Sequence, residues 1–281
     1  MATRKPTSGP KAVLDIAVGG ACGKMGERVL AVLAGEAGCR LAAAIEREGH
    51  PGAGKDVGEA LGQAKRGVPI EAALSRKVDV LIDFSHASAT AARLAECVKL
   101  GVPILVGTTG LDGPTHEALK AAGKRIPVCV ASNVSVGANL LFRLAAEAAK
   151  VLGDAYDVEI VEAHHRMKKD APSGTALTLA QRVAEALGRD LEKERRDGRR
   201  GDVGARTDRE IGIHAVRAGD IVGEHTITFA GMGERIEIVH RASTRDTFAR
   251  GAVRAACWLA GAKAGYYRIE EALGMEQARA T

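Results

Sequence analysis

The stretch from Val13 to Leu33, VLDIAVGGACGKMGERVLAVL, decides the fold class of this chain. Its first six residues are almost all apolar, as in a buried strand, and the run stops at Gly19-Gly20. From Met25 to Leu33 apolar side chains recur at helical spacing, and Leu41 to Ile45 then reads as a second strand. A strand, a helix and a second strand in this order predict a parallel β-α-β unit.

The same alternation continues as far as residue 131. Strands are predicted over 78–83, 103–107 and 127–131, with helices over 88–100 and 114–122 between them. This order predicts a Rossmann-like, doubly wound parallel sheet of the α/β class. Such sheets bind ligands beyond the carboxyl ends of their strands, so the residues that follow each strand are the first candidates for a site.

A second domain, of α+β type with a mixed sheet, is predicted from Val134 onward. The chain there reads as a helix, a strand, a helix and three extended stretches, over 137–152, 157–162, 174–187, 211–216, 224–230 and 235–241. A last helix over 247–262 is expected to return to the first domain. The predicted domains are therefore 1–133 together with 241–281, and 134–240.

Bulk properties argue against several functions. The net charge of +5 is a small difference between 40 basic and 35 acidic residues, and 3% of the chain is aromatic, so no nucleic-acid surface is expected. The segment 189–210 holds 8 basic and 7 acidic residues and is predicted to be a solvated surface loop. Five scattered cysteines without C-x-x-C spacing, and no apolar run long enough for a bilayer, predict a cytoplasmic protein without disulfides or a membrane span.

The first glycine turn predicts a dinucleotide site. Gly20, Gly23 and Gly26 are spaced G-x-x-G-x-x-G between a strand and a helix, where a pyrophosphate can approach free N–H groups. This spacing departs from the usual G-x-G-x-x-G, and a plain tight turn is the alternative. Glu46 follows the second strand, where a carboxylate can bind ribose hydroxyls, and Arg47 could pair with the 2'-phosphate of NADP. The pair predicts that both NADH and NADPH are accepted.

Two further loops follow predicted strands, at 107–110 (GTTG) and 131–133 (ASN). They are candidates for contact with the nicotinamide side of the cofactor. Ordinary turn chemistry is the alternative, because Gly, Thr, Ser and Asn are common in loops.

The stretch EAHHRMKKDAPSGTA, residues 162–176, is the candidate catalytic segment. Ser173-Gly174-Thr175 precedes an apolar helix, whose free N–H groups can hold a carboxylate while Lys168 supplies an opposing charge. A histidine beside this anion site can donate a proton near neutral pH. No metal is predicted, since adjacent histidines on an extended segment point to opposite faces. The other alternative is a charged loop that caps a helix.

Together with GGACGKMG, GTTG, SNVSVGAN and AVRAGDIVGEHTITFAGMGERIEIVHRAS, this stretch resembles the 4-hydroxy-tetrahydrodipicolinate reductase (dihydrodipicolinate reductase) family over nearly the whole chain. The resemblance implies the NAD(P)H-dependent reduction of 4-hydroxy-tetrahydrodipicolinate to tetrahydrodipicolinate in lysine and diaminopimelate biosynthesis. It also implies a homotetramer assembled through the sheet of the second domain, which would bind the small dicarboxylate substrate.

The resemblance assigns roles to particular residues. His164 is the general acid and Lys168 its catalytic partner, while substrate contacts fall on His165, Ser173, Gly174 and Thr175. With Arg47 added for its charge, the expected cofactor residues are Gly20, Ala21, Cys22, Gly23, Lys24, Met25, Glu46, Arg47, Gly107, Thr108, Thr109, Ala131, Ser132, Asn133 and Val134. Two of these depart from the family pattern: Cys22 stands where many members have glycine, and Val134 where an aromatic residue is frequent.

Two rival functions remain. An aspartate dehydrogenase or a related enzyme would share the glycine turn but not the HHRMKKDAPSGT run. A regulator that senses NAD(H) would bind the dinucleotide without chemistry, and His164 and Lys168 would then be dispensable.

Overall fold

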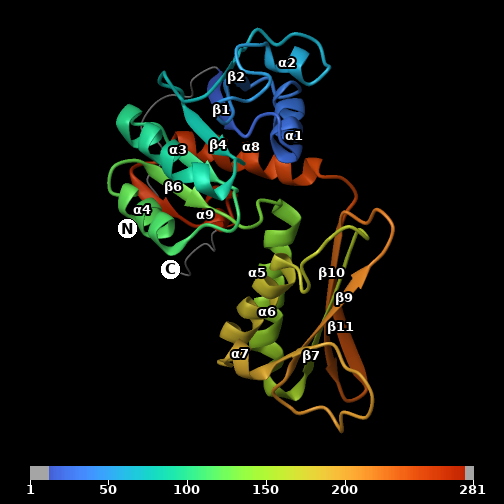
Figure 1. Cartoon of the computed structure of the whole chain (residues 1–281). Coiled ribbons are helices and arrows are strands. Elements are labelled where there is room, and N and C mark those ends of the chain that lie inside the picture. Colours follow the sequence, from blue (N-terminus) through green and yellow to red (C-terminus); the bar gives the residue numbers. More distant parts are fainter. Residues whose placement is uncertain (1–12, 276–281) are drawn as a thin grey trace. The chain divides into compact units, whose positions relative to one another are not determined.

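The computed structural model describes residues 13–275, which form two compact units (Figure 1). Unit 1 contains the described residues up to Ser135 and those from Asp246 onward, and unit 2 spans Val136–Arg245. The predicted domain boundaries, after 133 and after 240, lie within five residues of these limits. The predicted extents 1–12 and 276–281 lie outside the described residues.

Unit 1 is built on a seven-stranded parallel sheet in the order β12-β6-β5-β4-β1-β2-β3. Its strands are β1 (Leu14–Gly19), β2 (Cys39–Ile45), β3 (Ile70–Glu71), β4 (Val80–Asp83), β5 (Ile104–Val106), β6 (Pro127–Val130) and β12 (Gly265–Tyr267). Its helices are α1 (Lys24–Leu33), α2 (Val57–Ala60), α3 (Ala87–Leu100), α4 (Gly113–Ala122), α8 (Asp246–Ala260) and α9 (Ile269–Ala272).

The helices of unit 1 cover its sheet in two groups. Helix α8 packs against α1 and against β4, β5 and β6, while α3 and α4 pack against each other and the same part of the sheet. Ala17, Leu81 and Ile104 share a buried core with Leu94 of α3 and Leu119 of α4. Because neighbouring strand residues point to opposite faces, the strands are apolar on both sides, as the sequence predicted.

Unit 2 carries a five-stranded mixed sheet in the order β11-β10-β7-β9-β8. Strand β10 pairs antiparallel with β11 and β7, whereas β7, β9 and β8 run parallel. The strands are β7 (Asp157–His164), β8 (Arg195–Asp197), β9 (Ile211–Arg217), β10 (Gly223–Gly231) and β11 (Glu234–Ala242). The helical elements are α5 (Val136–Leu152), the 3-10 turn η1 (Gly153–Ala155), α6 (Gly174–Ala186) and α7 (Leu191–Glu194). Side chains of α5 and α6 share one core with the sheet, so the predicted fold class is confirmed for both units.

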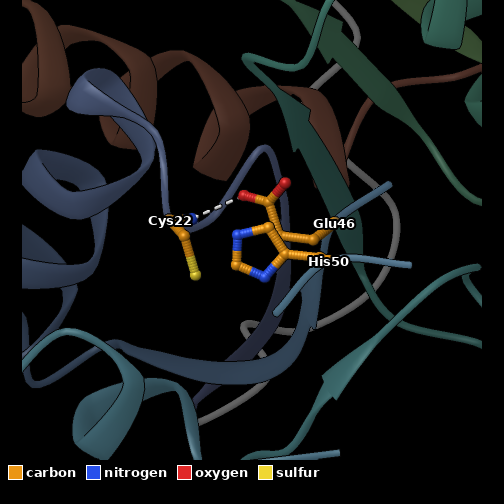
Figure 2. A group of neighbouring side chains, drawn as sticks. All are labelled: Cys22, Glu46 and His50. Atoms are coloured by element: carbon orange, nitrogen blue, oxygen red, sulfur yellow. Dashed lines mark hydrogen bonds between the residues drawn. The ribbon is translucent and has the colours of Figure 1, made fainter. Parts of the chain in front are cut away.

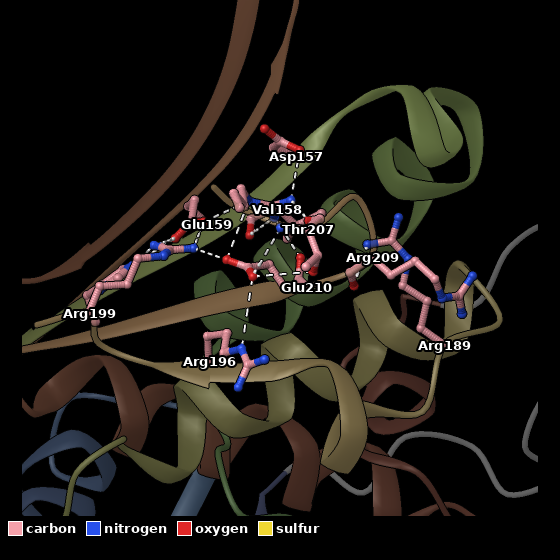
Figure 3. A network of polar contacts seen from close by, with 11 residues as sticks. Asp157, Val158, Glu159, Arg189, Arg196, Arg199, Thr207, Arg209 and Glu210 are labelled. Carbon is pink, nitrogen blue, oxygen red and sulfur yellow. Dashed lines mark hydrogen bonds and ion pairs between the residues drawn. The ribbon is translucent and has the colours of Figure 1, made fainter. Parts of the chain in front are cut away.

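The prediction that 189–210 is a solvated surface loop is wrong for 191–197, which form α7 and β8, and is confirmed for 198–209, a mostly exposed loop. At one end of the segment the side chain of Arg189 is fully buried, with Nη2 2.6 Å from Asp154 Oδ1. Glu210 is also buried and pairs with Arg199, part of the network in Figure 3. Arg189 pairs with Asp154 and Arg199 with Glu159, which lie outside the segment, and these ion pairs let a charged segment fold onto a sheet edge.

Among the described residues, no helix is long and apolar enough to cross a membrane.

Candidate active site

The glycine turn closes over the carboxyl end of β1, at the point where the strand order reverses between β1 and β4. Gly20 has φ +70°, and a Cβ there would lie 2.6 Å from the carbonyl oxygen of Phe84, directly after β4. A Cβ at Gly26 would lie 2.1 Å from the Gly20 carbonyl oxygen. Glycine is therefore required at both positions for the turn to pack this tightly. Such a switch point is where open parallel sheets bind nucleotides.

The start of α1 suits a phosphate. Gly23 is its N-cap and has no side chain with which to satisfy the first N–H groups of the helix. Lys24 is exposed beside it, while Ala21 is fully buried and Met25 partly buried. The first turn can therefore accept an anion from outside, with Lys24 adding positive charge.

The predicted ribose carboxylate lies against the glycine turn. Oε1 of Glu46 accepts a hydrogen bond from the Cys22 backbone N–H at 2.7 Å, and Arg47 beside it is exposed. His50, which the sequence did not single out, completes a group of three whose ligand atoms lie within 4.8 Å of one another (Figure 2). Its Nδ1 already accepts the Gly52 N–H at 3.1 Å, and Glu46 is engaged by the turn. Glu46 and His50 are therefore both hydrogen-bonded to backbone N–H groups.

The two remaining candidate loops of unit 1, at 107–110 and 131–133, make contacts that stabilise the fold itself. The Thr108 hydroxyl is buried and donates to the carbonyl oxygens of Asp83 and Ser85, at 3.3 and 3.1 Å. This bond ties the loop after β5 to the loop after β4. Gly107 is needed there because a Cβ would lie 2.2 Å from the Phe84 ring, whereas Thr109 is exposed.

In the loop after β6, Ala131 and Val134 are buried and Ser132 is exposed. Asn133 Oδ1 accepts the Ser135 N–H at 2.9 Å, an Asx-type turn. The Val134 carbonyl packs against Gly251 of α8, where a Cβ would lie 1.9 Å away. Thr109 and Ser132 are therefore the side chains of the two loops that remain open to a ligand.

The catalytic segment lies in unit 2 and centres on Glu162 of β7. This carboxylate is fully buried, and its Oε2 lies 2.6 Å from His164 Nδ1. Arg217 of β9 donates to both oxygens, at 2.8 and 2.9 Å, and the Ser173 N–H donates to Oε1 at 3.0 Å. Burial alone would raise the pKa of Glu162, but the bonds from Arg217, His164 and Ser173 lower it below its ordinary value.

The segment predicted to hold an anion forms the N-terminus of α6. Ser173 caps the helix, its Oγ accepting the Ala176 N–H at 3.1 Å, while Gly174 is exposed and Thr175 partly buried. The Ser173 hydroxyl also lies 3.2 Å from Nε2 of the buried His225. This bond fixes the hydroxyl, so the helix start is held in one arrangement.

Lys168 lies near His164 but is engaged by a neighbour. Its Nζ donates to both oxygens of Asp170, at 2.8 and 2.9 Å, and the exposed Asp170 lets this pair open toward a ligand. His165 is partly buried, and its carbonyl oxygen accepts the Lys168 N–H at 3.0 Å. A bound carboxylate could replace Asp170 as the partner of Lys168.

Burial lowers the pKa of both central histidines, His164 and His225. It lowers the pKa of His164 below its ordinary value, and the hydrogen bond to Glu162 opposes this fall only in part. His225, whose ring meets that of His164 edge-on at 5.3 Å, has its pKa lowered to about 3 by burial and by the charge of His164. The ring of His225 is therefore neutral at physiological pH, which leaves His164 as the candidate of the two for proton exchange.

Sequence reasoning missed several members of this group: Glu162 as a hub, Arg217, His225 and Gly223. A Cβ at Gly223 would lie 3.1 Å from His164 Nε2. Glu162 and His164 are two residues apart in a strand, a spacing that puts both on one face and could have drawn attention to the carboxylate. Arg217, Gly223 and His225 come from β9 and β10, and no local signal connects them to β7.

A Rossmann-like sheet with a glycine turn at its switch point, joined to a mixed α+β unit, defines the class of protein: a nicotinamide-dependent oxidoreductase. Models of the N-terminus and C-terminus of dihydrodipicolinate reductase match residues 14–134 and 137–273. The chain belongs to the dihydrodipicolinate reductase family.

Individual relatives cover nearly the whole chain. The 4-hydroxy-tetrahydrodipicolinate reductase of Syntrophus aciditrophicus is 46% identical over 265 residues, 93% of this chain and 99% of the relative. That of Alkalilimnicola ehrlichii is 51% identical, covering 92% and 98%. A solved structure, dipicolinate-bound dihydrodipicolinate reductase from Paenisporosarcina sp. TG-14, is 27% identical with a TM-score of 0.74, covering 92% of this chain and 98% of that chain. The predicted resemblance is confirmed.

Proposed function

We propose that this protein reduces 4-hydroxy-tetrahydrodipicolinate to tetrahydrodipicolinate with NADH or NADPH, a step of lysine and diaminopimelate biosynthesis. The observation that carries the proposal is the position of His164. Its ring is held by a buried carboxylate, with the cation of Lys168 close by and the Ser173-capped helix start bonded to the same carboxylate. This arrangement suits a small dianion that must be gripped and protonated.

The cofactor residues fit a dinucleotide. Gly20 and Gly26 are required for the tight turn, because side chains there would collide with backbone. In the cradle formed by Gly20, Gly23 and Gly26, the N-cap Gly23 leaves the first N–H groups of α1 without a side-chain partner, so they can bind a pyrophosphate. Glu46 is placed to bind ribose hydroxyls, and the exposed Arg47 can meet a 2'-phosphate, which supports use of both nucleotides. When bound, the reduced nicotinamide supplies a hydride.

The chain's own residues would do the rest. Lys168 leaves Asp170 and pairs with a carboxylate of the substrate, and the N–H groups of Gly174 and Thr175 with the Ser173 cap hold that carboxylate at the start of α6. His165 adds a polar contact. The 4-hydroxyl of the substrate leaves as water together with a ring proton, and the conjugated imine that results receives the hydride. The imidazolium of His164 gives a proton from Nε2 to the carbon centre next to the one being reduced, while Glu162 keeps Nδ1 protonated.

The outer face of the unit 2 sheet supports assembly into a homotetramer. Val161, Val216 and Val239 point away from the α5–α6 core and are 41–43% exposed. Val161 of β7 and Val239 of β11 both pair with Thr226 of β10, which lies between them, so these two valines lie in one row across the sheet. Exposed apolar side chains on a sheet face favour burial against another copy. We propose that the tetramer works in the cytoplasm on a small molecule, without nucleic acid or a membrane.

A coupled assay tests the function. Purified protein is given the condensation product of aspartate semialdehyde and pyruvate, and loss of NADH or NADPH absorbance is followed. His164→Ala and Lys168→Ala should each lower kcat by about 100-fold or more while NADH affinity stays nearly unchanged. Lys193→Gln, an exposed change on α7, is the matched control and should keep full activity. Near-normal turnover in both Ala variants would refute the assignment.

A further inference from the structure

We propose that Glu162 and Arg217 form a positioning pair that fixes the orientation and the tautomer of His164, so that Nε2 is the nitrogen that exchanges a proton with the substrate. This inference rests on the proposed role of His164 as proton donor. Neither Glu162 nor Arg217 need touch the substrate for it to hold.

The contacts of Glu162 leave it a single orientation. One oxygen accepts from Arg217 Nη2 and the Ser173 N–H, and the other accepts from Arg217 Nη1 and His164 Nδ1, all between 2.6 and 3.0 Å. Arg217 is itself held by the carbonyl oxygens of Val216 and Asp170. A carboxylate engaged on both oxygens and fully buried cannot turn away from the imidazole.

This geometry dictates where protons reside. An ionised carboxylate only accepts hydrogen bonds, so the Nδ1 that it meets carries a proton in both charge states of the ring. Neutral His164 then has a bare Nε2, and the imidazolium carries its second proton there. A proton can leave from and return to Nε2 without a ring flip, which keeps the transfer distance constant.

Arg217 and Glu162 shift the pKa of the His164 imidazole in opposite directions. The groups that face His164 are Glu162 on β7, Arg217 on β9, Lys168 in the turn after β7 and the neutral ring of His225 on β10. Glu162 favours the imidazolium, while Arg217 and Lys168 disfavour it. The pair therefore gives the ring a fixed acceptor without leaving an uncompensated negative charge beside it.

Because Glu162 raises the pKa of His164 and Arg217 lowers it, substitutions at the two residues give a test. In Glu162→Gln the pKa of His164 should fall, and in Arg217→Met it should rise, both measured by NMR titration of the imidazole in the full-length protein. The limb of the kcat/KM profile assigned to His164 should move in the same two directions. We expect kcat to fall about 10- to 100-fold in Glu162→Gln, the usual effect of losing an orienting partner. Glu162→Asp, which keeps the charge, should restore part of it.

Glu192→Gln, on the exposed end of an ion pair with Arg195, is the matched control and should move neither quantity. If Arg217→Met does not fold, Arg217→Lys keeps the charge but loses the two-pronged contact, and the titration should then move little while kcat falls. An unmoved His164 titration in Glu162→Gln, with only thermal stability lowered, would overturn the positioning role. If the titration moves as expected but the rate profile does not follow, the pair positions His164 and the proton-donor assignment is what fails.

Discussion

The carboxylate of Glu46 accepts a hydrogen bond from the backbone N–H of Cys22, 2.7 Å away, and so joins the end of β2 to the glycine turn. The bond holds the carboxylate at the rim of the nucleotide cradle, with Arg47 exposed next to it. One residue suited to a ribose diol and one suited to a phosphate thus sit side by side.

Substitutions at this pair should separate the two nucleotides. Glu46→Gln should raise the KM for NADH by about 10-fold, the equivalent of about 1.4 kcal/mol and within reach of one charge-assisted hydrogen bond, and change the KM for NADPH less. Arg47→Ala should raise the KM for NADPH and leave that for NADH nearly constant. Steady-state kinetics with each nucleotide measures both. Equal effects on the two nucleotides in both variants would contradict the assignment.

A methyl group at Gly223 should disturb catalysis without unfolding unit 2. Its Cβ would lie 3.1 Å from His164 Nε2, closer than ordinary packing, so the ring must shift away. Displacing a reacting group by a fraction of an ångström costs rate, and we expect Gly223→Ala to lower kcat by about 10-fold or more. Gly113→Ala, where a Cβ meets nothing within 4 Å, is the control. A full-rate Gly223→Ala enzyme would show that Nε2 needs no clearance.

The network of Figure 3 should make stability depend on pH. Burial would raise the pKa of Glu159, but hydrogen bonds from Arg199, His214 and Arg206 outweigh it and hold that pKa at about 2. A carboxylate whose folded pKa lies below its ordinary 4.5 stabilises the fold above that pH, and this stabilisation is lost as pH falls from 4.5 toward 2.

Thermal melts of Glu159→Gln test this link. The Tm deficit relative to the parent protein should be largest at neutral pH, from a loss of about 1–3 kcal/mol, and should shrink below pH 4.5. Glu224→Gln, an exposed partner of Arg241, should show almost no deficit. A deficit that stays constant down to pH 2 would mean that packing, rather than charge, accounts for the effect.

Cys39 and Cys257 should form a disulfide under mild oxidation. Their Sγ atoms lie 3.3 Å apart, at the start of β2 and within α8, and need to close to about 2.05 Å. With oxidised glutathione the two thiols lose two electrons and two protons to the added disulfide, and peptide mapping should find residues 39 and 257 linked. The oxidised protein should melt at a higher temperature, because the link joins distant parts of unit 1.

Cysteine variants check the pairing. Cys39→Ser should abolish both the link and the rise in Tm, whereas Cys22→Ser should keep them. Burial and the neighbouring Cys39 thiol raise the pKa of Cys257 to about 12, so Cys39 should react first and Cys257 should resolve the mixed disulfide. Free thiols at both positions 39 and 257 after treatment with oxidised glutathione would contradict the prediction.

Much of the fold could be predicted from local pattern. The apolar run before Gly19 and the helical spacing after Gly23 identify β1 and α1, because a strand buried on both faces and an amphipathic helix leave different periodicities. The short elements β3, β8, β12, α2, α7 and α9 were missed, since two to four residues carry no period. The prediction of a solvated loop over 189–210 failed in part for another reason: charged residues of this segment pair with Asp154 and Glu159, which lie elsewhere in the sequence.

The residues of the candidate site also fall into two groups, those that the local sequence predicts and those that it does not. The glycine turn, Glu46 after β2 and the His164 to Thr175 segment could be found from local sequence, because each depends on residues next to one another along the chain. The central position of Glu162, and the placement of Arg217, Gly223 and His225 around His164, became visible only in the folded chain. Those partners arrive through strand pairing of β7 with β9 and β10, and the register of a sheet depends on the burial of whole strands rather than on any local motif.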